Sequence, residues 1–216
     1  WYLENVFYHS IPKIYNYIQH NIYDGKPIDN EIIDLGFWPG GDRDGNPFVT
    51  TQITLDVAER LRQTILKNYF RDVKRLKRRF TFDGVQDILA RVEKRLYKHV
   101  VKSYDVVNFS QKILLEELYA AREIVVNKHQ SLFIEELNDV INKVRIFGFH
   151  FATLDIRQDS RMHHHAFTKI VEDLHKNGDT TFPENYLRLS EEEQVKVLST
   201  VKGKIDPSIL TDEVSV

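Results

Sequence analysis

Residues 147–160 read FGFHFATLDIRQDS, and this stretch decides the fold that we expect. Its phenylalanines alternate with small or weakly polar residues, so both faces of an extended chain are largely apolar, which is typical of a strand buried on two sides. We therefore predict a strand over 147–156. A helix is expected to follow it, capped by Asp159 or Ser160 and running to about His175.

A second strand is expected near the start of the chain. Residues 31–37 are apolar and partly β-branched, and a loop rich in Gly and Pro follows over 38–49. An apolar strand, a polar loop with an arginine and a capped helix form the βα unit of an α/β barrel, in which sites lie at the carboxyl ends of the strands. We therefore predict neighbouring parallel strands, with Trp38 and Arg157 at the same end.

Helical patterns fill most of the remaining chain. Ser10 is expected to cap one helix, with Pro12 in its first turn, and Thr50 or Thr51 to cap a long one. Further helices are expected over about 85–96, 110–128 and 131–145, and after a capping box formed by Ser190 and Glu193. The predicted fold class is mainly α with two parallel β-strands, a partial α/β (TIM-type) barrel elaborated with many helices.

Composition narrows the class of protein. The chain has 216 residues, of which 42% are hydrophobic and 29% charged, and a net charge of −2. This balance does not favour nucleic-acid or membrane partners. The sequence has no cysteine, which excludes disulfides and thiolate metal sites and fits a reducing cytoplasm.

The loop at 38–47, WPGGDRDGNP, is a candidate anion site. Arg43 offers a planar fork for phosphate or carboxylate, Asp42 and Asp44 could orient it, and Asn46 could pin the turn. The glycines that allow positive φ and close approach of a ligand are Gly40, Gly41 and Gly45. An equally open interpretation is a structural pair of Asp-Gly and Asn-Pro turns, with Arg43 in local salt bridges.

The end of the second predicted strand is another candidate. Asp155 and Arg157 point to the same side of an extended chain, and Arg157 comes just before a helix N-terminus, which also attracts anions. The alternative is an ion pair between these two residues at the rim, with no ligand.

Two further motifs are expected not to be binding sites. Adjacent helical residues point about 100° apart, so the run His163 to His165 cannot converge on one metal ion. We predict no metal site in the chain; His163 is expected to order the loop after Arg157. The basic run over 71–79 is expected to be a solvated helix face rather than a nucleic-acid patch.

Together, the two loops resemble signatures of the phosphoenolpyruvate carboxylase family. The first is GGDRDGNP with Val49 and Thr50 after it and Trp38 before it; the second runs from FGF through LDIRQDS to His163. The resemblance covers about residues 1–200. Its other parts are Tyr2-Leu3-Glu4, Ile11-Pro12-Lys13, Tyr186 and the Ser190–Glu193 run. The chain departs from the family pattern at Asp159, usually Glu, and at Leu189, often Trp.

The resemblance implies that residues 1–202 are an internal segment of the carboxylase barrel, with 203–216 a tail whose composition allows mobility. Such enzymes are lyases that fix carbon dioxide: they add bicarbonate to phosphoenolpyruvate, giving oxaloacetate and phosphate, and use Mg²⁺ or Mn²⁺. The family is typically cytoplasmic and homotetrameric. A second hypothesis is a helical binding or scaffold module without the reaction; a nucleic-acid binder is a weaker third.

The resemblance also implies residue roles. Arg157 corresponds to a catalytic arginine that binds the substrate phosphate. Trp38 walls the pocket, and Arg43 and Asp44 organise it. The family's histidine motif, metal-binding carboxylates and mobile glycine-rich loop do not occur in this sequence, so the remainder of the parent chain is an implied partner.

We predict that this chain alone does not catalyse the reaction, because the histidine and the metal ligands are missing from it. A coupled oxaloacetate assay with phosphoenolpyruvate, bicarbonate and Mg²⁺ measures this. Turnover above the rate without protein would contradict the expectation.

Overall fold

The structure is a computed structural model that describes residues 1–26, 28, 32–101, 109–202, 204–206 and 208. It divides into two compact units. Unit 1 comprises Trp1–Pro39 and Gln52–Asp155, and unit 2 comprises Gly40–Thr51 and Ile156–Val216. Most of the predicted tail, namely 203, 207 and 209–216, lies outside the described residues.

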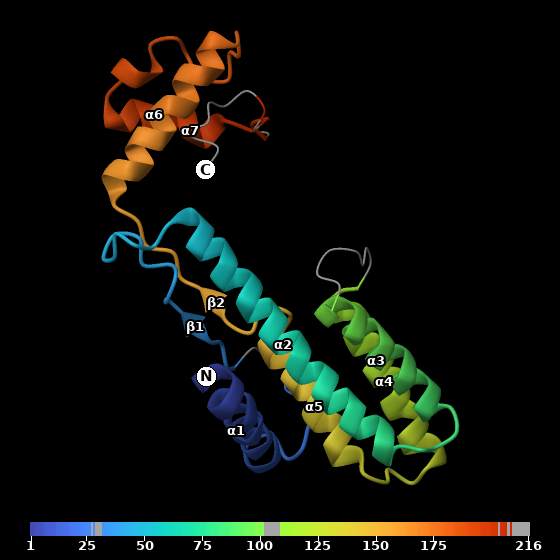
Figure 1. The fold of residues 1–216 in the computed structure, drawn as a ribbon. Coiled ribbons are helices and arrows are strands. Elements are labelled where there is room, and N and C mark those ends of the chain that lie inside the picture. The colour runs from blue at the N-terminus through green and yellow to red at the C-terminus, as the bar shows by residue number, and fades with distance from the viewer. Residues whose placement is uncertain (27, 29–31, 102–108, 203, 207, 209–216) are drawn as a thin grey trace. The chain divides into compact units, whose positions relative to one another are not determined.

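Helices dominate both units (Figure 1). The helices are a π-helical turn Leu3–Phe7, α1 (Tyr8–Asn21), α2 (Thr51–Arg79), α3 (Val85–Val101), α4 (Gln111–Lys128), α5 (Ile134–Phe147), α6 (Ser160–Lys176), a 3₁₀ turn Tyr186–Arg188 and α7 (Glu191–Thr200). The strands are β1 (Gly36–Phe37) and β2 (Thr153–Leu154). A mainly α fold with two parallel strands is therefore confirmed. None of the described helices combines the length and apolar character that crossing a bilayer requires.

Unit 1 is a bundle in which α3 packs on α4 and α4 on α5. The long helix α2 buries Ile65, Tyr69 and Val73 completely, at the spacing of four that keeps side chains on one helical face. The predicted apolar stripe of α3 is likewise buried, which confirms that element. The buried residues of α3 are Val85, Ile88, Leu89, Val92 and Leu96.

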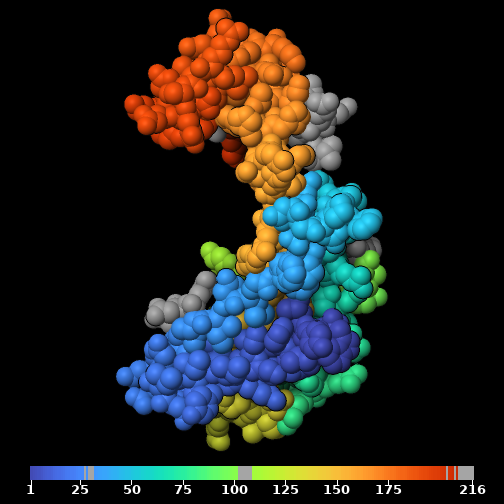
Figure 2. Space-filling view, turned by 90° about the vertical axis from the view of Figure 1, so that its left-hand side faces the viewer, coloured from blue at the N-terminus to red at the C-terminus, as the bar shows by residue number. Residues whose placement is uncertain are grey.

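The start of the chain differs from the prediction. The turn Leu3–Phe7 runs directly into α1, so Ser10 lies inside a helix and has no free N-terminus to cap. Pro12 is likewise inside α1. In Figure 2, α1 and the residues after it, dark to mid blue, form the surface of unit 1 that faces the viewer.

The two strands pair as expected but are much shorter. β1 and β2 are parallel, with Gly36 opposite Thr153 and Phe37 opposite Leu154. The predicted burial on both faces is wrong, because Gly36 and Thr153 are exposed, while Phe37 and Leu154 are half-buried. Of the predicted first strand, Glu31 lies outside the described residues.

The phenylalanine-rich stretch 147–152 is not a strand. Phe147 is the last residue of α5, and Gly148, with φ 54°, ends the helix in a conformation that favours glycine. The rings of Phe147 and Phe151 meet edge to face at 5.4 Å, and both contact the ring of Tyr8. The alternation therefore serves a buried aromatic cluster at a helix end.

Unit 2 contains α6 and α7. Ser190 caps α7, and Glu193 completes the predicted capping box by accepting from the Ser190 backbone N–H. A small core holds the helices and the 3₁₀ turn together. Its buried residues are Val171, Leu174, Phe182 and Tyr186.

A buried ion pair joins three helices of unit 1. Lys143 on α5 lies 2.9 Å from Asp72 on α2, and their side chains are only 4% and 7% exposed. Asp72 also accepts from the Tyr8 hydroxyl at 2.8 Å, and Lys143 contacts Asp139 at 2.8 Å. Burial raises the pKa of Tyr8 well above its usual value, so this hydroxyl stays protonated and donates.

The substitution Lys143→Met is expected to lower the free energy of unfolding by about 3 kcal/mol, because it leaves the buried Asp72 with only the exposed Arg75 as a charged partner. Adding Asp72→Asn should recover part of that loss, since it removes the buried charge that lost its buried partner. Urea denaturation followed by circular dichroism measures both variants.

The matched control is Lys94→Met on the exposed side of α3, which should change stability by no more than about 0.5 kcal/mol. Equal stability of Lys143→Met and Lys94→Met would contradict the importance of the buried pair.

Candidate functional site

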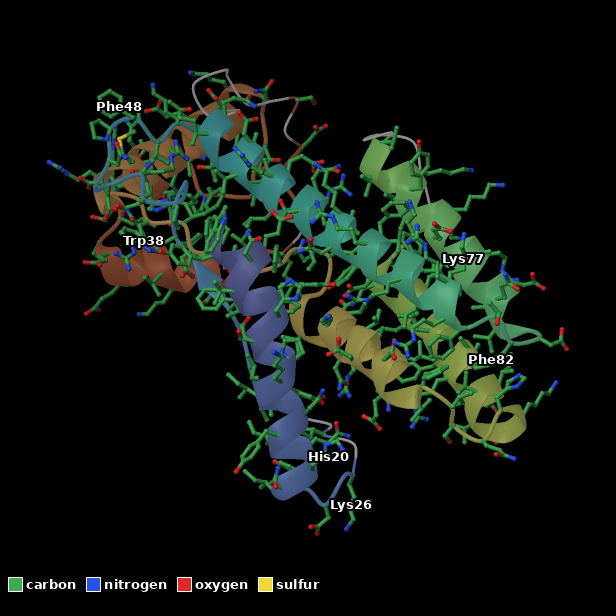
Figure 3. The ribbon with its side chains drawn as sticks, turned by 60° about the horizontal axis from the view of Figure 1, so that its bottom comes forward. His20, Lys26, Trp38, Phe48, Lys77 and Phe82 are labelled. Atoms are coloured by element: carbon green, nitrogen blue, oxygen red, sulfur yellow. The ribbon has the colours of Figure 1, made fainter. Side chains whose placement is uncertain are left out.

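In unit 1 the candidate residues follow the two parallel strands. Trp38 comes directly after β1, and its side chain is 56% exposed (Figure 3). Asp155 comes directly after β2, and its backbone N–H donates to the Phe37 carbonyl at 2.8 Å. A Cβ on Gly36 would lie 3.2 Å from the Asp155 carboxylate, so the glycine allows this close approach.

In unit 2 the backbone brings Arg157 to the glycine-rich loop. The N–H of Arg157 donates to the Gly41 carbonyl at 2.8 Å, and the N–H of Arg43 donates to the Arg157 carbonyl at 3.0 Å. Asp42 is the parallel bridge partner of Arg157. Paired residues of a ladder place their side chains on the same face, and successive residues alternate. Asp42 therefore shares a face with the exposed Arg157.

The loop has the turn chemistry that its sequence indicates. The Asn46 side-chain oxygen accepts from the Phe48 N–H at 3.0 Å, which is an Asx turn. Of the three glycines expected to adopt positive φ, only Gly40 does so, with φ 88°, and for Gly41 and Gly45 that expectation is wrong. A Cβ on Gly45 would lie 2.7 Å from the Asp42 carboxylate, so a side chain there would displace that carboxylate.

Arg43 lacks the local salt bridges that one interpretation of the loop expects. Neither Asp42 nor Asp44 lies within 4.0 Å of its guanidinium, and no other described carboxylate does. Its Nε is buried and has no hydrogen-bond partner among the described residues. Because an orphaned buried donor costs stability, this N–H is suited to an acceptor from a ligand or a further segment.

Helix α6 begins next to Arg157. Asp159 is its N-cap and accepts from the Arg161 N–H at 2.9 Å, while Ser160 is the first helical residue. Hydrogen bonds from the Arg161 side chain and backbone lower the pKa of Asp159, so the cap is a carboxylate at neutral pH. His163 is exposed in the first turn, and its N–H donates to the Asp159 carbonyl at 3.4 Å.

The described residues offer no metal centre: no group of three or more His, Asp or Glu side chains among them could hold an ion. The three consecutive histidines are all exposed. No reaction step through a metal ion is therefore assigned to this chain.

The basic run of α2 is largely neutralised within unit 1. Ion pairs join Arg71 to Glu4, Arg75 to Asp72, Lys77 to Glu93 and Arg79 to Glu136. A run whose charges are already compensated has little capacity to release phosphate counterions, so it does not favour nucleic-acid binding.

Sequence reasoning missed Gly36, which makes room for Asp155. Gly41 was expected as a loop glycine, but not that its carbonyl accepts from the Arg157 N–H. A glycine at the end of a predicted strand is the signal that could have identified Gly36.

Comparisons with known proteins bear out the resemblance. The family model for phosphoenolpyruvate carboxylase matches residues 1–112 and 89–207. The phosphoenolpyruvate carboxylase of Nitrosomonas eutropha is 27% identical over 214 residues, which cover 79% of this chain and 23% of the relative. That of Aeromonas hydrophila is 26% identical, covering 97% of this chain and 27% of the relative.

A third relative, from Thermosynechococcus vestitus, is 26% identical and covers 91% of this chain and 24% of its own length. The chain therefore spans about a quarter of the length of the curated relatives that it matches.

Gly45→Ala is expected to displace the Asp42 carboxylate, since the new Cβ meets it at 2.7 Å while the backbone at residue 45 needs no left-handed conformation. The amide NMR signals of Gly41, Arg43 and Arg157 should shift. In the Asp42→Ala background the same substitution should shift them much less, because the obstacle is gone. Equal shifts in both backgrounds would contradict the contact.

Proposed function

The chain belongs to the phosphoenolpyruvate carboxylase family, and on that premise we propose that residues 1–202 are an internal segment of an enzyme that adds bicarbonate to phosphoenolpyruvate, giving oxaloacetate and phosphate. In this proposal the segment supplies substrate-binding loops. It is not active alone, because the chain spans about a quarter of its relatives' length.

The observation that carries the proposal is the main-chain pairing of Arg157 with the glycine-rich loop. Two backbone hydrogen bonds, at 2.8 and 3.0 Å, hold Arg157 next to Arg43 although the two lie far apart in the sequence. Both arginines belong to the motifs that resemble the family signatures. Main-chain anchoring fixes the backbone of the exposed Arg157, so a charge held there needs no reorganisation during a reaction.

The intermediates of the proposed reaction are of a kind that fixed cations stabilise. Transfer of the phosphoryl group from phosphoenolpyruvate to bicarbonate gives carboxyphosphate and the enolate of pyruvate, and the enolate carbon then takes up the carboxyl group as phosphate leaves. Every species on this path is anionic, so preorganised arginines stabilise the developing charge. We assign the substrate phosphate to Arg157, and the organisation of the pocket to Arg43 and Asp44.

Trp38 has a different role in this proposal. Its exposed indole is suited to close one wall of a pocket against another part of the parent enzyme. Excluding water there protects carboxyphosphate and the enolate from hydrolysis and protonation.

The remaining features of the family complete the proposal. β1 and β2 are two strands of a TIM-type barrel whose other strands lie elsewhere in the parent enzyme. Residues elsewhere in that enzyme hold the Mg²⁺ or Mn²⁺, since the described residues contain no group of three or more His, Asp or Glu side chains that could hold an ion. The parent is a cytoplasmic homotetramer.

The test is Arg157→Ala in the full-length parent enzyme. We expect kcat/KM to fall by roughly 100- to 1000-fold, because a charge contact made in the transition state is typically worth about 3–4 kcal/mol. The fold should persist, since both backbone hydrogen bonds of residue 157 remain possible. Steady-state kinetics and circular dichroism measure the two properties.

Arg161→Ala is the matched control: it removes another exposed arginine, in the first turn of α6, that pairs with Asp159. It should leave kcat/KM within about threefold of the original. A folded Arg157→Ala enzyme with near-normal kcat/KM would overturn the assignment.

A further inference from the structure

A cavity of about 460 Å³ lies in unit 1 and is lined by α1, α4, α5 and the turn that follows α1. None of the candidate carboxylase residues lines it. His20, near the end of α1, is one of its lining residues (Figure 3). Its volume is within the range of sites for small molecules.

Two arginines face this cavity from neighbouring helices, Arg122 on α4 and Arg145 on α5. Both use neutral oxygens as hydrogen-bond partners. The Arg122 Nε donates to the Asn138 side chain at 2.8 Å, and the Arg145 guanidinium donates to the Ile28 carbonyl at 2.5 Å. Among the described residues, no carboxylate lies within salt-bridge distance of either.

A neighbouring cavity of unit 1 differs in the pairing of its arginines. It is also lined by two arginines, Arg75 and Arg79, but each is paired with a carboxylate. Compensated guanidinium groups have little charge to offer a ligand, whereas those of Arg122 and Arg145 keep theirs. A guanidinium also retains several donors after one hydrogen bond, in a fork that matches carboxylate and phosphate.

Polar groups on the cavity wall are held in place by the protein. Asn142 is 7% exposed and donates to the Asn16 side chain at 2.9 Å, and the Asn16 carbonyl is 2.8 Å from a ring nitrogen of His20. Ordered side chains of this kind lose little entropy when a ligand binds.

One carboxylate, Glu135, is among the described lining residues, and it is exposed. It lines both cavities, so it lies on the rim that they share. The two guanidinium groups and one carboxylate among the described lining residues therefore give the cavity one excess positive charge.

We propose that this cavity binds a small organic anion whose carboxylate or phosphate group is held between Arg122 and Arg145. The polar wall on α1 and α5 then contacts the rest of the ligand. The site is independent of the carboxylase proposal, because it uses none of the same residues.

The test titrates inorganic phosphate and, separately, succinate into the 216-residue chain at constant ionic strength set with NaCl, since salt screens exposed charges. Calorimetry gives the Kd, and amide NMR shifts give the location. Saturable binding by either probe, with shifts in α4 and α5 around the two arginines, is the expected result. The probe with the lower Kd shows whether the cavity prefers a phosphate or a carboxylate group.

Three variants make the test specific. Arg122→Gln, on an exposed helical position, should raise the Kd by about tenfold or more. Glu135→Gln should lower the Kd, because it removes the opposing charge. The matched control Arg60→Gln removes an exposed arginine of α2 that does not line the cavity, and should leave the Kd unchanged.

The proposal is overturned if neither probe saturates, or if Arg122→Gln and Arg60→Gln weaken binding equally. These outcomes leave the carboxylase proposal untouched, because they measure binding to the chain rather than turnover of the parent enzyme.

Discussion

The buried contact between Lys143 and Asp72 constrains unit 1 more than any apolar contact does. Hydrophobic burial is non-directional and tolerates sliding of one helix on another, whereas a buried charge is costly wherever its partner is not in reach. The pair therefore fixes α5 against α2, and Tyr8 adds α1 through the same carboxylate. The end of α5 follows from this, since the Tyr69 hydroxyl of α2 reaches the Gly148 carbonyl at 2.7 Å. The start of β2 depends on where that helix ends.

The helices were readable from the sequence because their apolar residues recur with a helical period, as Ile65, Tyr69 and Val73 do. The strand over 147–156 was not, because alternating phenylalanines satisfy two geometries equally well. A strand would place them on one face; the observed helix end and turn gather Phe147 and Phe151 around Tyr8, a residue far away in the sequence. The positive φ angles of Gly148 and Phe151 separate the two, and neither can be predicted from these residue types alone.

The candidate site was readable to a similar extent. Local chemistry, such as the Asx turn at Asn46, is contained in neighbouring residues and could be predicted. Contacts between residues distant in the sequence could not be predicted. The pairing of Arg157 with Gly41 depends on tertiary structure, and so does the burial of the Arg43 Nε without a partner among the described residues. The alternative of local salt bridges for Arg43 was reasonable from its two flanking aspartates, but the backbone directs the groups apart.

The way in which Arg157 is anchored has an evolutionary consequence. Its backbone N–H and carbonyl both bond to the loop, and any residue other than proline can make these two hydrogen bonds. Selection can therefore exchange the guanidinium while the backbone pairing survives. Under the role proposed for Arg157, a descendant that had lost the arginine would keep the same fold and lose the activity. Within such a lineage, the fold alone would not distinguish active enzymes from inactive homologues.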